Sequence, residues 1–152
     1  MSTHDARFMT EALIEARKAL KNNEVPVGAV VVKNNRIIAR AYNQNIRFND
    51  PSAHAEIIAL KKTGKHLKNH RLHGCTVYVT IEPCVMCAGA MVHARIKKVV
   101  FGAYDPKTGA CGSVFNIPGS EKLNHRLMVV GGALEKECSS VIRDFFKKRR
   151  KT

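Results

Sequence analysis

Two short stretches of the sequence hold residues that could bind a catalytic metal ion. Cys84 and Cys87 stand three positions apart in Pro-Cys-Val-Met-Cys, and His54 stands thirty positions earlier in His-Ala-Glu. On a helix, cysteines with this spacing lie on one face, so both thiolates can reach the same ion. One histidine and two cysteines suit Zn²⁺, and three protein ligands leave the fourth tetrahedral position open for water. The combined spacing therefore predicts a catalytic zinc site rather than a closed structural one.

Glu56 is the residue that we expect to move protons in this site. It stands two positions after His54, so helical spacing does not make it a fourth ligand on the same face. Two thiolates and a neutral imidazole leave Zn²⁺ formally neutral, and a carboxylate is then needed as a base for the water. Glu56 would take that proton and return it to the substrate later in the reaction. The alternative role is a carboxylate that only complements the helix dipole.

The cysteines allow other interpretations. Cys-x-x-Cys could be a redox pair, or half of a structural zinc site completed by Cys75, Cys111 or one of seven histidines. The five cysteines are an odd number in a chain with no export signal, which argues against a disulfide framework. Cys75 and Cys138 lie in apolar patterns and are expected in the core. The preceding His-x-Glu stretch favours the catalytic zinc site.

The charge of the chain indicates a polyanionic partner. There are 26 Lys and Arg against 12 Asp and Glu, a net charge of +14. Five basic residues and no acidic one lie between Glu56 and Glu82, and six basic residues lie from Arg143 to Lys151. Nucleic acid is favoured over a membrane, with a basic surface kept for solubility as the alternative. No apolar run is long enough for a bilayer and no secretory signal is evident, so we expect a soluble cytoplasmic protein.

The hydrophobic pattern predicts the elements that must position these residues within one domain, 1–152, with a basic end at about 143–152. Helices are expected at 8–20, 51–62 (capped by Asp50, with Pro51 first), 84–94 and from 134 onward. Strands are expected at 27–32, 36–41, 75–80, 98–101 and 127–130, the first two joined by a hairpin at Asn34-Asn35. Residues 102–126 read as a long loop with room for one helical turn. This order predicts an α/β fold, a mixed sheet with helices on both faces.

The motifs resemble those of the zinc nucleobase deaminases, in which His-x-Glu is followed by Pro-Cys-x-x-Cys. More narrowly, the chain resembles the bacterial tRNA-specific adenosine deaminases over nearly its whole length. The similar stretches are Glu24–Val30, Asp50–Glu56, Tyr78–Met91, Val99–Ala103, Asp105–Gly109 and Asn124-His125. The resemblance implies a cytidine-deaminase-like three-layer sandwich with a mixed five-stranded sheet. It also implies a homodimer with one Zn²⁺ per subunit on His54, Cys84 and Cys87, and Glu56 as proton donor and acceptor.

The same resemblance implies a substrate and its contacts. The reaction would be hydrolytic deamination of adenosine to inosine at the wobble (first anticodon) position of tRNA-Arg, with attack at adenine C6. Asn43 corresponds to a residue that hydrogen-bonds the flipped nucleotide, and Asp105 and Lys107 to contacts with flanking nucleotides. Phe145, Phe146, Arg149 and Arg150 correspond to a C-terminal element that closes on the RNA loop. The alternatives are a turn Asn, a solvated polar loop, a core Phe on the apolar stripe and a solvated basic tail.

Two other functions share part of this pattern. A zinc-dependent deaminase of a free base or nucleoside, such as guanine or cytosine, would need the same ligands and Glu56. It would have no need of a charge of +14. A non-catalytic RNA-binding module with a structural zinc would account for the charge, but it would not need a carboxylate facing an open metal position.

Overall fold

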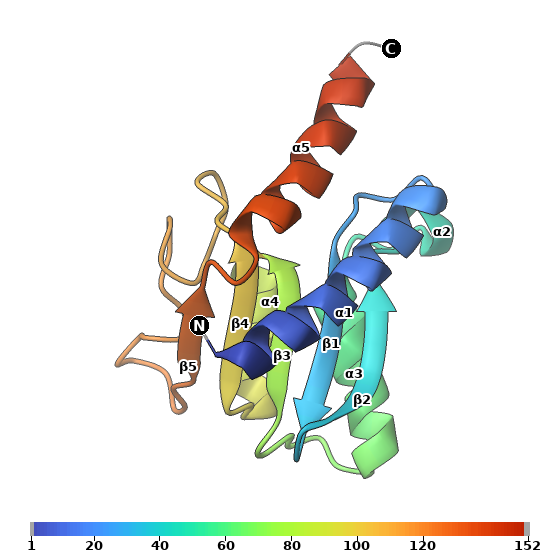
Figure 1. Cartoon of the computed structure of the whole chain (residues 1–152). Coiled ribbons are helices and arrows are strands. Elements are labelled where there is room, and N and C mark those ends of the chain that lie inside the picture. The colour runs from blue at the N-terminus through green and yellow to red at the C-terminus, as the bar shows by residue number, and fades with distance from the viewer. Residues whose placement is uncertain (1, 151–152) are drawn as a thin grey trace.

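The computed structural model describes residues 2–150, which fold around one five-stranded sheet (Figure 1). The elements in chain order are α1 (Thr3–Lys21), β1 (Gly28–Lys33), β2 (Arg36–Tyr42), α2 (Asn45–Phe48), α3 (Ala55–Leu67), β3 (Thr76–Ile81), α4 (Val85–Ala94), β4 (Lys98–Ala103), β5 (Met128–Gly131) and α5 (Glu135–Arg150). Within these described residues, no helix has the length and hydrophobicity needed to cross a membrane.

The sheet is mixed, as the sequence predicts. Its strand order is β2-β1-β3-β4-β5, in which β1 pairs antiparallel with β2 and β3, and β4 pairs parallel with β3 and β5. The parallel pairs need crossover connections, and α4 supplies the one between β3 and β4. Helices α1 and α5 lie on one face of the sheet, while α3 and α4 lie behind it (Figure 1). The predicted three-layer α/β architecture is therefore confirmed.

Each face of the sheet has its own hydrophobic core, because side chains alternate along a strand. In β3, Val77 and Val79 pack on the side of α3 and α4, while Tyr78 packs against Phe8 of α1. The close approach of α1 to the sheet depends on Gly28. A Cβ atom at that position would lie 2.1 Å from the backbone oxygen of Ala12.

One end of the sheet gathers the segments that carry the predicted site. The register pairs Gly28 with Tyr42, and Ile81 with Ala103, so β1 begins where β2, β3 and β4 end. Ligand sites of open α/β sheets form outside the carboxyl ends of strands, where successive loops meet. The segments that follow β2, β3 and β4 all start from this end and carry the predicted metal ligands, Glu56, Asn43, Asp105 and Lys107, while α5, with the remaining predicted contacts, follows β5, which runs parallel to β4.

The predicted helix from Pro51 is wrong at its start, because α3 begins at Ala55. Asp50 Oδ1 accepts hydrogen bonds from the backbone N–H and the hydroxyl of Ser52. This Asx turn, a structure that competes with helix, contains Pro51. The chain therefore turns once more before α3 starts, and His54 becomes its N-terminal cap residue.

Helix α2, a single turn, is not among the elements predicted from the sequence. The Glu24 carboxylate caps it by accepting hydrogen bonds of 3.0 and 2.9 Å from the N–H groups of Ile46 and Arg47. A four-residue helix has no hydrophobic period, and its capping residue lies more than twenty positions away. The predicted long loop between β4 and β5 is confirmed. It consists of turns and one isolated bridge between Cys111 and Asn116, without the helical turn for which the sequence had room.

Candidate active site

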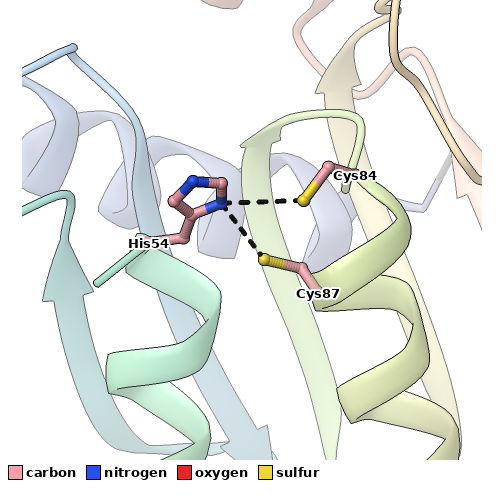
Figure 2. A group of neighbouring side chains, drawn as sticks. All are labelled: His54, Cys84 and Cys87. Carbon is pink, nitrogen blue, oxygen red and sulfur yellow. Dashed lines mark hydrogen bonds between the residues drawn. The ribbon is translucent and has the colours of Figure 1, made fainter. Parts of the chain in front are cut away.

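His54, Cys84 and Cys87 converge on one point between α3 and α4 (Figure 2). The His54 Nδ1 atom lies 3.7 Å from Cys84 Sγ and 3.4 Å from Cys87 Sγ, and the three atoms lie within 4.8 Å of one another. Tetrahedral zinc, with bonds of about 2.0 Å to nitrogen and 2.3 Å to sulfur, places these atom types about 3.6 Å apart. The three side chains thus have the separation that one zinc ion requires.

The three predicted ligands stand at the first turns of two facing helices. His54 is the N-terminal cap residue of α3, Cys84 is that of α4, and Cys87 lies one turn into α4. The positive ends of both helix dipoles point at the thiols and favour their deprotonated form. Cys87 is fully buried, whereas His54 and Cys84 are partly exposed. One of the three predicted ligands is therefore shielded from solvent, while the other two reach it.

Hydrogen bonding sets the charges of these groups. The hydrogen bond with the Cys87 thiol lowers the pKa of Cys84 to about 4, and the same bond together with burial raises the pKa of Cys87. Hydrogen bonding to Cys84 raises the pKa of His54. Cys84 is accordingly a thiolate at neutral pH, the form that binds a cation. A metal ion competes with protons for these three groups, so its affinity falls in acid.

Glu56 is buried in the first turn of α3, with 3% of its surface exposed. Burial raises the pKa of this carboxyl, and its side chain interacts with the Cys87 thiol. A carboxyl group with a raised pKa can both accept and return a proton near neutral pH. Glu56 thus has the environment expected of a general acid and base beside the metal ligands.

Asn43 enters the site from the end of β2. It is buried, and its Oδ1 atom accepts a hydrogen bond of 2.7 Å from the backbone N–H of Ala55. This bond satisfies an N–H group at the start of α3 that no helical carbonyl can reach. Its acceptor is therefore committed to α3, and its Nδ2 group is the donor that remains for a ligand.

Four of the residues predicted to contact RNA line one groove of about 940 Å³ at the same end of the sheet. They are Asp105, Lys107, Arg149 and Arg150, from the segment after β4 and from α5. The Asp105 carboxylate accepts hydrogen bonds from the N–H groups of Lys107 and Thr108 and from the Thr108 hydroxyl, which fixes this turn.

The aromatic pair of α5 divides between the interior and the groove. Phe145 is buried and does not line the groove, and the Arg149 guanidinium lies 4.6 Å above its ring. Phe146, which is 46% exposed, lines the groove instead. Residues 151–152, the end of the predicted basic tail, lie outside the described part of the chain.

Comparison with known proteins identifies the family. The MafB19-like deaminase family matches residues 3–150. The tRNA-specific adenosine deaminase of Bacillus subtilis is 48% identical over 98% of this chain and 92% of its own length. That of Haemophilus influenzae is 51% identical over 98% of this chain and 87% of its own length. This chain belongs to the tRNA-specific adenosine deaminase family.

The fold of this deaminase agrees with the same assignment. A solved structure from a study of A-to-I editing by tRNA:A34 deaminases at the wobble position of transfer RNA superposes with a TM-score of 0.86. It is 42% identical, and the match covers 89% of this chain and 98% of that one. The cytidine-deaminase-like architecture predicted from the motifs is therefore confirmed.

Glu82 is a residue of the deaminase that the sequence analysis did not single out. It follows β3 directly, is 2% exposed, and accepts hydrogen bonds from the Ser113 hydroxyl and from three backbone N–H groups. Burial alone would raise its pKa, but these donors hold the pKa of Glu82 below its usual value. An acidic residue at the end of a buried β-branched strand, directly before Pro83-Cys84, was the available signal.

Proposed function

We propose that this deaminase hydrolyses adenosine to inosine at the wobble position of tRNA-Arg. The relatives named above support a tRNA substrate, and the solved structure concerns editing at the wobble position. The observation that carries the proposal is the position of the His54, Cys84 and Cys87 group at the same end of the sheet as a groove lined by Lys107, Arg149 and Arg150. In this proposal, one nucleic-acid loop contacts both the predicted metal site and the basic side chains of the groove.

We propose one Zn²⁺ per subunit, held by His54 Nδ1 and the sulfur atoms of Cys84 and Cys87. Soft thiolate ligands with one imidazole favour zinc over magnesium or calcium, which prefer oxygen ligands. Bound zinc supplies a Lewis acid that lowers the pKa of a water molecule at the open position. The chemistry of the three donors and their separations fit this ion.

In this proposal, Glu56 carries the protons of the reaction. It accepts one proton from the water that attacks adenine C6 and delivers it to N1 of the ring. It then transfers the second proton of that water to the departing amino group, so that ammonia leaves and inosine remains. Its burial, which raises the pKa, keeps the carboxyl able to hold the proton between these transfers. The Nδ2 group of Asn43 donates a hydrogen bond to the flipped nucleotide.

The groove would hold the nucleotides that flank the reacting one. Lys107, Arg149 and Arg150 supply positive charge for the phosphates. Phe146 supplies a half-exposed ring on which a base can stack. The Asp105 carboxylate accepts a hydrogen bond from the N–H of Thr108 and so fixes the turn that forms the opposite wall of the groove. The buried ring of Phe145 packs under the Arg149 guanidinium. A deaminase of a free base would not require this charged and aromatic groove.

We also propose a homodimer formed through α4. This helix is apolar around its whole circumference, with His93 as its one polar side chain, although α4 lies on the surface of the protomer. Val85 and Met86 on its outer side are 46% and 38% exposed. A helix that is apolar on all sides is typical of a buried position, and a second copy would bury this one. We further propose that residues 1–152 form one deaminase domain that acts in the cytoplasm.

The test is deamination of a tRNA-Arg anticodon stem-loop that carries adenosine at the wobble position. Free adenosine, cytidine, guanine and cytosine are assayed in parallel at the same enzyme concentration. The proposal predicts inosine in the stem-loop and little turnover of the free compounds. Turnover of a free base with none on RNA would contradict it and would assign the same residues to a small-molecule deaminase.

A further inference from the structure

The buried carboxylate of Glu82 holds the segment between β4 and β5 in place. Its Oε1 atom accepts a hydrogen bond of 3.1 Å from the N–H of Asp105 and another from the Ser113 hydroxyl. Its Oε2 atom accepts bonds of 3.0 Å from the N–H groups of Cys111 and Ser113. Four hydrogen bonds thus join one side chain to both ends of the stretch 105–113.

The segment is closely fitted to this carboxylate. Gly109 packs directly against it, since a Cβ atom there would lie 2.4 Å from Glu82 Cδ. The neighbouring N–H of Ala110 donates a hydrogen bond of 2.8 Å to the carbonyl of Pro83. The stretch 105–113 therefore wraps around Glu82-Pro83, and any shift of Glu82 must move it.

The position of Glu82 in the chain links two parts of the site. Two residues after it stands Cys84, a predicted zinc ligand, and the segment that it holds carries Asp105 and Lys107 of the groove. The Glu82 side chain therefore contributes four of the hydrogen bonds that set the distance between the predicted metal ligands and the groove wall, beside the backbone bond from Ala110 to Pro83. We infer that Glu82 is a positioning residue that sets the RNA-binding wall against the metal centre, and so governs RNA affinity rather than the chemical step. This inference rests on the function proposed above.

The substitution Glu82→Gln tests the inference with the smallest change of shape. A glutamine amide keeps one acceptor oxygen but must turn its NH₂ group toward at least one backbone N–H. Placed at the Oε1 position, that group can still donate to the Ser113 hydroxyl, but it loses the bond to Asp105. We expect KM for the anticodon stem-loop to rise about tenfold, in line with the loss of a hydrogen bond to a charged group. We expect kcat and the zinc content of the purified enzyme to stay within about twofold of wild type.

Two further variants make the test decisive. Glu11→Gln on α1 is the matched control, a carboxylate outside the site, and should leave KM and kcat unchanged. Ser113→Ala removes only the hydroxyl bond and should raise KM about threefold. It decides the question if Glu82→Gln does not fold. An unchanged KM, or a fall of kcat and zinc content at constant KM, would overturn the inference. If the wild-type enzyme leaves the stem-loop unreacted, the proposed function itself fails.

Discussion

Asn43 Oδ1 accepts a hydrogen bond of 2.7 Å from the N–H of Ala55, the residue that separates His54 from Glu56. One side chain thus fixes the start of α3, from which both the predicted metal ligand and the predicted proton carrier project. The same bond limits what Asn43 can offer a substrate, because it occupies one lone pair of Oδ1 and orients the Nδ2 donor. The amide is therefore divided between a structural and a binding function.

This division predicts different effects for two substitutions of Asn43. Asn43→Asp keeps the acceptor for Ala55 and removes the donor, so Tm should stay near wild type while KM for the stem-loop rises about tenfold. Asn43→Ala removes both groups and should also cost about 1 kcal/mol of stability, as the loss of a helix cap does. Thermal melting and steady-state kinetics of the two variants make the comparison. An Asp variant that binds the stem-loop as tightly as wild type would refute a donor role for Asn43.

Metal removal should abolish activity, and zinc should restore it. Cys84→Ala should lose most of its zinc, because two ligands hold the ion far less tightly than three. Cys75→Ala is the control, since this cysteine is buried at the other end of β3 and should leave zinc content unchanged. Because the pKa values of His54 and Cys87 are raised, zinc should also dissociate more readily as the pH falls. Elemental analysis at several pH values measures this, and full zinc content in Cys84→Ala would contradict the ligand assignment.

Phosphate contacts in the groove predict a steep dependence of RNA binding on salt. Arg150→Ala should weaken stem-loop binding and reduce the slope of log K against log salt by about 0.7, the value for one lost phosphate contact on a single strand. Arg36→Ala is the control, because Arg36 lies at the opposite end of the sheet, where it stands across from Lys33 in the register of β1 and β2. Fluorescence titrations from low to moderate salt give both slopes. Equal slopes for the two variants would remove Arg150 from the RNA contacts.

The acid stability of the fold should depend on Asp5. Burial alone would raise its pKa, but hydrogen bonds from the Tyr78 hydroxyl and from Ser2, together with the charge of Lys98, hold it below the usual value. A carboxyl with a lowered pKa stabilises the fold above its unfolded pKa, and this contribution is lost as the pH falls through the folded pKa. Asp5→Asn should therefore lower Tm at pH 7, and the difference from wild type should shrink below about pH 4. A Tm difference that does not change with pH would show that the charge of Asp5 contributes nothing.

The sequence predicted those parts of the fold that depend on periodic patterns. The five strands lie within two residues of their expected bounds, because β-branched and aromatic runs such as Val77–Val79 are typical of buried strands. The grouping of His54 with Cys84 and Cys87 was also predictable, since the spacing of the two cysteines restricts them to one helical face. Side-chain type and helical period were sufficient for both.

Two of the features that the sequence did not predict depend on hydrogen bonds between residues far apart in the chain. Glu24 caps α2 although it stands more than twenty positions earlier in the sequence. Glu82 likewise accepts hydrogen bonds from Cys111 and Ser113, which stand more than twenty positions later. The sequence separation of such partners varies freely, so no local pattern contains them. The start of α3 differs from the prediction for a local reason. The Asp50 side chain accepts hydrogen bonds from Ser52 and so forms a turn instead of capping a helix.

The most direct test of the account is the rate of inosine formation in the wobble-adenosine stem-loop by wild type and Glu56→Gln, prepared with equal zinc content. The account predicts inosine with the wild-type enzyme and a rate at least about a hundredfold lower with the variant, since the amide cannot carry the proton. Binding of the stem-loop should be equal in the two proteins. A variant that forms inosine at the wild-type rate would contradict the role of Glu56 and, with it, the mechanism proposed for this site.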